Sequence, residues 1–174
     1  MIQAIDIYYR LRDEVQQQVV ALSKQHGDWI HCQKGCSSCC LKLTVWPVEF
    51  YAILNEMKAV NWPKPVEDNQ RACGYLDEHG ACQMYPFRPI ICRTHGLPLA
   101  YWQDDNDPPG YGVSFCEKNF DAAHDIRFDS ENTLNMDEVN EKLARINIVF
   151  LEEHKELNLK PTDRIELKQL LEYL

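Results

Sequence analysis

The sequence has no apolar run of about 18 residues, the length that a membrane-spanning helix would need. Its first residues lack the basic stretch and the uninterrupted apolar run of a secretory signal peptide. Glycine-rich nucleotide-binding fingerprints are missing as well, and so are internal repeats, low-complexity segments and linkers between domains. We therefore expect a single-domain cytoplasmic protein without a membrane partner.

Positive charge is also scarce. The chain has 27 acidic and 18 basic side chains, which give a formal net charge of -9. No cluster of basic residues reverses this field locally, so the protein should repel nucleic acids and anionic membranes. We expect no nucleic-acid partner.

Cysteine, by contrast, is abundant, with eight residues of which four fall within the nine positions from Cys32 to Cys40. A core can bury one thiol as a small apolar side chain, but four thiols in so short a run need a shared electrophilic centre. The other four are spread over a middle segment rich in turn residues, so the chain must fold back to join the two halves. We predict that all eight are metal ligands: Cys32, Cys36, Cys39, Cys40, Cys73, Cys82, Cys92 and Cys116.

Three other uses of the cysteines fit less well. A disulfide framework is typical of small secreted domains, whereas this chain shows no signal peptide and is long enough to build its own core. The gaps of three, two and no residues between the first four cysteines differ from those of a bacterial ferredoxin. No histidine pair follows a cysteine pair at the spacing of a two-Cys, two-His zinc finger.

Helical periodicity dominates both ends of the chain. Apolar residues recur at three- and four-residue steps over residues 3–26, after Pro47, and over 136–150 behind a capping box formed by Asn135 and Glu138. A last helix is expected over residues 163–173. The turn residues within 73–85 predict a hairpin with Cys73 and Cys82 on opposing strands. Residues 86–98 should be irregular because of their prolines, and residues 104–112 should form a polar loop.

The expected fold class is therefore mainly α, with a small irregular or β-hairpin, cysteine-rich, metal-binding insert. The N-terminal helix falls within residues 1–30, the metal-binding region within 31–117 and the C-terminal helices within 118–174. All three belong to one expected domain.

The spacing of the cysteines narrows the expected site. Two residues separate Cys36 from Cys39, as in the tight knuckle that brings two sulfurs to one ion. Cys39 and Cys40 are adjacent, and adjacent side chains diverge, so we expect them to serve two neighbouring metals or to bridge them. Eight thiols suffice for two tetrahedral sites, or for one four-cysteine cluster and a second site. His95, three residues after Cys92, is either a reserve ligand or an ordinary turn residue.

Basic side chains near the thiolates should matter, because a zinc ion with four thiolates still carries a charge of about -2. We predict that Arg93, next to Cys92, donates hydrogen bonds to the groups around the metal. Arg88 is expected to donate either to sulfurs or to backbone carbonyls at its turn. Lys34 and Lys42 are expected to be solvated.

The cysteine run and a second string downstream resemble a known family. The string Cys82-Gln-Met-Tyr85-Pro86-Phe-Arg88-Pro89-Ile-Ile-Cys92-Arg93 is specific. Together with the run from Cys32 to Cys40, it resembles the CxxCxxCC family, also called the YkgJ-type cysteine-cluster proteins. The resemblance covers residues 32–116 and implies a zinc- or iron-chelating domain with eight cysteines. The chain departs from the family pattern by having three residues, not two, between Cys32 and Cys36.

Three functions of different classes follow as expectations. Closed sites, most simply holding up to two zinc ions, would make this a structural or storage metal protein. An iron-sulfur cluster, as is thought to occur with similar cysteine motifs in flagellin N-methylases, would make it a redox or radical-type enzyme subunit. Readily exchanged metal would make it a trafficking or protein-interaction module. A nucleophilic cysteine enzyme is a weaker fourth option, because nothing in the sequence singles out one thiol.

The sequence leaves two questions open. It does not decide whether the chain is an enzyme, and it does not identify a protein partner beyond the metal ions. Methylase activity is not expected, because no glycine-rich fingerprint supports a site for a methyl donor.

Overall fold

The computed structural model describes residues 3–65, 73–105, 108–120 and 126–174. Its helices are α1 (Ala4–Gln25), α2 (Pro47–Ala59), α3 (Ile90–Thr94), α4 (Met136–Glu153) and α5 (Leu170–Tyr173). Its strands are β1 (Thr44–Val45), β2 (Leu99–Gln103), β3 (Gly110–Ser114), β4 (Leu134–Asn135) and β5 (Ile165–Glu166). Short 3-10 helices cover Gly27–Trp29, Tyr85–Phe87, Lys155–Leu157 and Leu167–Gln169. The fold is thus mainly helical, as predicted, and it also contains two small sheets within the described residues.

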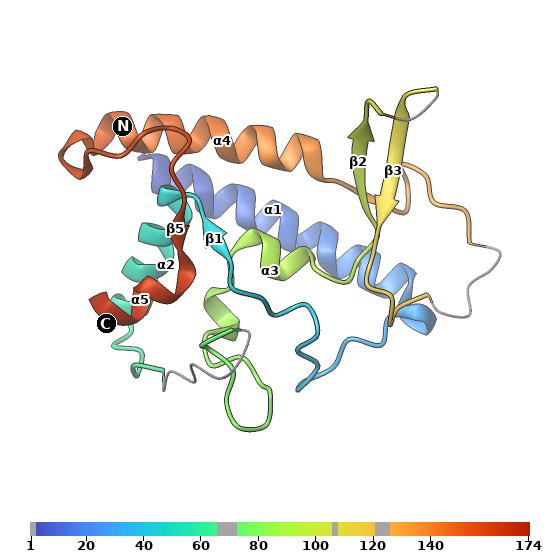
Figure 1. Ribbon diagram of the computed structural model, residues 1–174, viewed down its shortest axis with the longest axis horizontal. Coiled ribbons are helices and arrows are strands. Elements are labelled where there is room, and N and C mark those ends of the chain that lie inside the picture. The colour runs from blue at the N-terminus through green and yellow to red at the C-terminus, as the bar shows by residue number, and fades with distance from the viewer. Residues whose placement is uncertain (1–2, 66–72, 106–107, 121–125) are drawn as a thin grey trace.

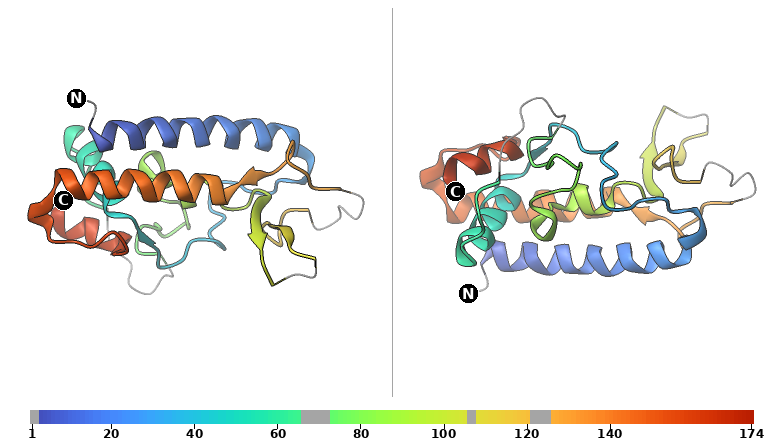
Figure 2. Two further views of the ribbon diagram at one scale, coloured as in Figure 1. Left: turned by 90° about the horizontal axis from the view of Figure 1, so that it is seen from above. Right: turned by 90° about the horizontal axis from the view of Figure 1, so that it is seen from below.

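Two long helices, α1 and α4, lie side by side and antiparallel along the length of the molecule (Figure 1, Figure 2). Both predicted apolar faces are confirmed. These faces bury Tyr8, Leu11, Val15 and Leu22 of α1 and Val139, Leu143, Ile146 and Phe150 of α4. Burial of each such side chain contributes about 1.5–3 kcal/mol, so the pair forms the main core. Asn135 caps α4 as predicted, because its side chain accepts hydrogen bonds from the backbone N–H groups of Asp137 and Glu138.

α2 begins at Pro47, as predicted. The backbone N–H of the first helical residue has no partner within the helix, so proline, which lacks this group, loses no hydrogen bond there. Its inner face starts a second apolar cluster, in which Phe50 and Met57 pack with Leu167 and Leu170 from the end of the chain. Beside this cluster, β1 pairs antiparallel with β5. The C-terminal segment is thus held against the segment that follows the cysteine run.

The predicted helix over 163–173 is wrong in its first half. There the chain forms β5, and the backbone N–H of Leu167 donates to the carbonyl of Leu43 at 2.9 Å. Helical geometry begins only with the turn Leu167–Gln169 and continues in α5. Pairing with a segment remote in sequence overrides the local helical preference.

A β-hairpin that was not predicted overlaps the end of the stretch expected to be a loop. β2 and β3 pair antiparallel, with Leu99 opposite Ser114 and Gln103 opposite Gly110. β4 adds to β2 in parallel. The predicted polar loop over 104–112 is therefore shortened at its far end by β3, and its residues 106–107 lie outside the described part of the chain.

The hairpin predicted over residues 73–85 is reduced to a turn. The turn itself forms, since the backbone N–H of Gly80 donates to the carbonyl of Asp77 at 3.0 Å. A single bridge joins Leu76 and Cys82, so Cys73 does not lie on a strand opposite Cys82. The tight turns of this segment leave too few residues for a longer ladder. α3, which also falls in a stretch expected to be irregular, follows directly after Pro89.

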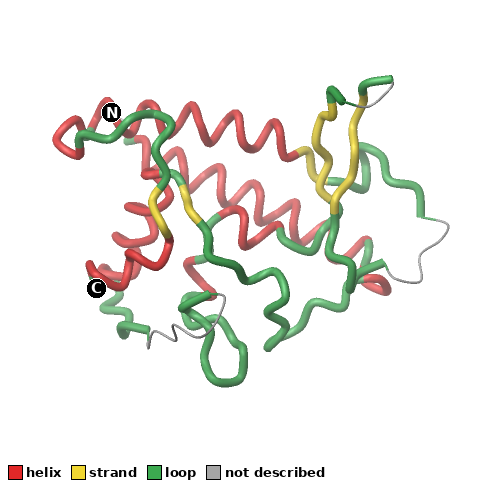
Figure 3. Tube along the Cα trace, viewed as in Figure 1, coloured by secondary structure: helices red, strands yellow, loops and turns green. Residues whose placement is uncertain are grey.

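The loops that carry cysteines gather on one side of the helices. The loop before β1 and the turn between α2 and α3 lie near one another below α1 and α3 (Figure 1, Figure 3). The β2–β3 hairpin lies at the opposite end of the α1–α4 pair from α2 and α5 (Figure 1, Figure 2). Among the described helices, none combines the length and the apolar character needed to cross a bilayer.

Candidate metal centre

The eight cysteines are free thiols, with Cys32 exposed and the other seven partly buried. The loop between α1 and β1 supplies four of them, and the turn between α2 and α3 supplies Cys73 and Cys82. Cys92 lies on α3, and Cys116 follows β3. The neighbours of each thiol therefore depend on how these segments meet.

One set of thiols surrounds Cys32. Burial raises the pKa of Cys32, and the charges of Cys36, Cys116 and Cys39 raise it further. Such an influence requires proximity, because interactions between charges near a protein surface are screened beyond about 10 Å. We call Cys32, Cys36, Cys39 and Cys116 the outer group.

A second set surrounds Cys92. Burial raises the pKa of Cys92 to about 12, and the charges of Cys73 and Cys82 contribute to the rise. The pKa of Cys40 is also raised, first by its hydrogen bond with Cys39 and then by burial and by Cys73 and Cys92. We call Cys40, Cys73, Cys82 and Cys92 the inner group. Two of its members, Cys73 and Cys82, pack against the apolar cluster of α2 and α5.

Cys39 and Cys40 stand between the two groups. Their thiols hydrogen-bond to each other, so these adjacent side chains do not diverge as the sequence analysis expected. The bond with Cys40 lowers the pKa of Cys39 most, and a bond with His95 lowers it further, to about 4. One proton is thus shared within the pair and held mainly by Cys40.

In the metal-free protein, we expect iodoacetamide to label Cys39 and not Cys92 at about pH 6, because the thiolate is the nucleophile. A pKa of about 4 leaves Cys39 deprotonated at that pH, whereas Cys92, with a pKa of about 12, keeps its proton. Peptide mapping by mass spectrometry measures both. In the urea-unfolded chain the two should react alike. Equal labelling of the two in the folded protein would contradict the assignment.

A buried asparagine ties the segments of the outer group together. The Oδ1 atom of Asn119 accepts from the backbone N–H of His31 at 2.9 Å, and its Nδ2 atom donates to the carbonyl of Gly96 at 2.7 Å. Nδ2 also lies 3.4 Å from the Cys32 sulfur, and the backbone N–H of Asn119 donates to the carbonyl of Cys116 at 2.8 Å. No pattern in the sequence predicts a role for Asn119 beyond its place three residues after Cys116.

Close backbone contacts bring the loops together at two glycines. Gly96 has a φ of +95°, and a Cβ atom there would lie 2.9 Å from the sulfur of Cys32. Gly80 has a φ of +76°, and its Cβ atom would lie 3.0 Å from the carbonyl oxygen of Gly35. Only glycine tolerates both the positive φ and the close approach at these positions. The turn after Cys73 therefore packs directly on the cysteine run.

α3 is anchored by a buried carboxylate. Glu49 of α2 is 3% exposed, and it accepts hydrogen bonds from the backbone N–H of Ile90 at 3.1 Å and from the hydroxyl of Tyr8 at 3.3 Å. Burial raises the pKa of Glu49, and these bonds partly offset the rise. Ile90 opens α3, whose first N–H groups have no partner within the helix. Glu49 thereby helps to position Cys92. Its role was not predicted, because the residues next to Glu49 in the sequence give no sign that its side chain is buried.

The two predicted arginine donors hydrogen-bond to oxygen atoms. Arg88 donates to the carbonyls of Tyr85 and Cys92 at 3.2 and 3.3 Å and lies over the Tyr85 ring, which is the second of its two predicted roles. Arg93 donates to two carbonyls of the same turn at 2.7 and 2.8 Å and to the side chain of Gln16 at 2.9 Å. Both arginines therefore brace the turn between the last two cysteines of the inner group.

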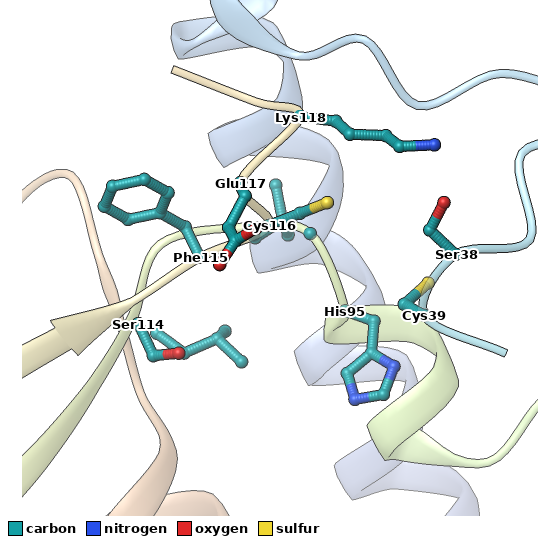
Figure 4. A pocket seen from close by; sticks show the side chains of 11 residues that line it. Ser38, Cys39, His95, Ser114, Phe115, Cys116, Glu117 and Lys118 are labelled. Carbon is teal, nitrogen blue, oxygen red and sulfur yellow. The ribbon is translucent and has the colours of Figure 1, made fainter. Parts of the chain in front are cut away.

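The outer group borders a cavity of about 360 Å³ (Figure 4). Cys39, Cys116 and His95 contribute to its walls. Figure 4 shows the sulfur of Cys116 directed toward the segment that carries Ser38 and Cys39. At least two thiols of the outer group can thus be approached from this cavity.

The chemistry of the donors suits zinc or iron, because both metals bind cysteine thiolates in sets of four. Within the described part of the chain, however, no three His, Cys, Asp or Glu side chains are grouped closely enough to hold an ion as they stand. Binding would therefore require the thiols of a group to turn toward one point. A cation would also relieve the mutual repulsion of thiolates that raises the pKa of Cys32 and Cys92.

Comparison with known proteins agrees with the resemblance noted in the sequence. Residues 31–109 match the model of the CxxCxxCC family, described as "Putative zinc- or iron-chelating domain". The match includes seven of the eight cysteines and ends before Cys116, earlier than expected. No curated protein and no solved structure matches the chain. The match over residues 31–109 therefore confirms the resemblance to the CxxCxxCC family in this part of the chain.

Proposed function

We propose that this protein binds two zinc or iron ions, one through the outer group and one through the inner group. The observation that supports this proposal is that Cys32 and Cys92 have separate thiol neighbours, with the hydrogen-bonded pair Cys39 and Cys40 joining the two sets. Four is the number of ligands that a closed tetrahedral site needs. Zinc is the simpler occupant, and an iron-sulfur cluster in either group is the alternative.

The proposed role is structural or storage metal binding. Bound metal would supply the positive charge that each set of thiolates lacks and would cross-link segments that are far apart in sequence. Such binding stabilises the folded chain, since an unfolded chain offers no preformed site. We treat residues 1–174 as one domain, because α1 contacts both α3 in the middle of the chain and α4 near its end. Eight free thiols are typical of a reducing compartment, which supports a cytoplasmic location.

Metal analysis of cysteine variants tests the proposal. We expect the anaerobically purified protein to carry about two ions per chain, and Cys116→Ser and Cys82→Ser each to lose about one of them. Each variant should also melt roughly 5 °C lower, because the lost site no longer stabilises the fold. Inductively coupled plasma mass spectrometry gives the stoichiometry, and an absorption spectrum distinguishes colourless zinc protein from brown iron-sulfur protein.

Ser38→Ala serves as the matched control, because Ser38 lies in the same run as four of the cysteines but has no thiolate. This variant should keep the full metal content. Unchanged metal content in both cysteine variants would refute the two shared sites.

A further inference from the structure

The outer and inner groups differ in their access to solvent. Cys32 is exposed, and Cys39 and Cys116 line the cavity of about 360 Å³ (Figure 4). A cavity of this size accommodates a small molecule, because ligand pockets begin at about 300 Å³. A chelating ligand could therefore reach sulfurs of the outer group without local unfolding.

The four inner cysteines are partly buried, and the segments that carry three of them are held against the rest of the fold. Cys73 and Cys82 pack against the apolar cluster that α2 shares with the C-terminal segment. Cys92 lies on α3, whose first residue is bonded to buried Glu49. Hydrogen bonds from Arg88 and Arg93 hold the turn between Cys82 and Cys92 in place. Displacement of an inner thiol would disturb this packing, so its exchange requires local opening of the fold.

We propose that the outer group is an exchange site and that the inner group is a permanent structural site. This inference rests on the proposed metal binding and assigns different roles to its two centres. The outer group would take up a thiophilic divalent cation and release it to a small thiol- or nitrogen-bearing chelator that enters the cavity. In the exchange, donor atoms of the chelator would replace cysteine thiolates as ligands of the cation, and each released thiolate would take up a proton from the incoming thiol or from the buffer. No oxidation or reduction is involved.

The test follows zinc release from the fully loaded protein after it is mixed with an excess of a chromogenic chelator. We expect two phases of equal amplitude, with rates that differ by at least about tenfold, because only the inner group needs local opening. Cys116→Ser should abolish the fast phase and keep the slow one. Cys82→Ser should do the reverse.

A tryptophan at the cavity tests the route of access. Ser38 is exposed and lines the cavity, so Ser38→Trp should slow the fast phase by about tenfold and leave the slow phase unchanged. Gln33→Trp is the matched control, because Gln33 is an exposed residue of the same loop that does not line this cavity. It should leave both rates unchanged. Equal effects of the two tryptophans would contradict the proposed route.

The wild-type protein offers a measurement that does not depend on the folding of a variant. When zinc is withdrawn in steps, N-ethylmaleimide should label Cys116 before it labels Cys82, as read by peptide mapping. A single release phase, or labelling of both cysteines at the same rate, would overturn the division of roles while leaving a stoichiometry of two zinc ions intact. Failure to bind zinc or iron at all would refute the proposed function and this inference together.

Discussion

Replacement of Glu49 by glutamine is expected to lower the free energy of unfolding of the metal-free protein by about 2–4 kcal/mol. The carboxylate is buried and accepts hydrogen bonds from the backbone N–H of Ile90 and the hydroxyl of Tyr8. Both of these donors contact Oε1, and the backbone N–H of Trp46 also bonds to the carboxylate. Glutamine has nearly the same shape, but it offers only one acceptor oxygen for these three donors. Urea unfolding measures the loss.

The metal content of the same variant gives a second readout. Because Ile90 opens the helix that carries Cys92, Glu49→Gln should also reduce metal binding by the inner group, while the outer group keeps its ion. Glu141→Gln is the matched control, since Glu141 is exposed and pairs with Arg145 one turn away. Loss of such a surface pair should cost less than about 0.5 kcal/mol. If the two variants are equally stable, the anchoring role of Glu49 is wrong.

Replacement of Asn119 by alanine should have an effect of similar size, about 2–4 kcal/mol, because it leaves two partly buried backbone groups without these partners. The N–H of His31 would lose its acceptor, and the carbonyl of Gly96 would lose its donor. The segments that carry Cys32 and Cys116 would then be free to separate. We expect selective loss of metal from the outer group, measured as a loss of about one ion per chain.

Asn147 provides the control for this second experiment. It is equally buried, and its side chain accepts from the backbone N–H of Val48 and donates to the carbonyl of Pro161. Asn147→Ala should destabilise the chain comparably without selective loss of metal from the outer group. Identical metal losses in the two variants would mean that Asn119 acts on overall stability and not on the outer group.

The parts of the fold that could be predicted depend on contacts between residues close in sequence. The three- to four-residue repeat around Leu11 and Leu143 predicts α1 and α4, and Pro47 marks the start of α2. The errors lie where a partner remote in sequence decides the geometry. The residues before Leu167 pair with β1 instead of continuing a helix, and the short spacing around Asp77 supports a turn but not a ladder.

The candidate site divides in the same way. The sequence by itself determined that eight cysteines, four of them within nine positions, point to soft metal ions, because ligand type follows from residue type alone. Only the tertiary structure decided which thiols are neighbours. Cys116 lies close to Cys32 because buried Asn119 joins their segments, and Cys92 is held in place because Glu49 anchors its helix. Burial and long-range hydrogen bonds arise when distant segments pack, and no local pattern of residues encodes them.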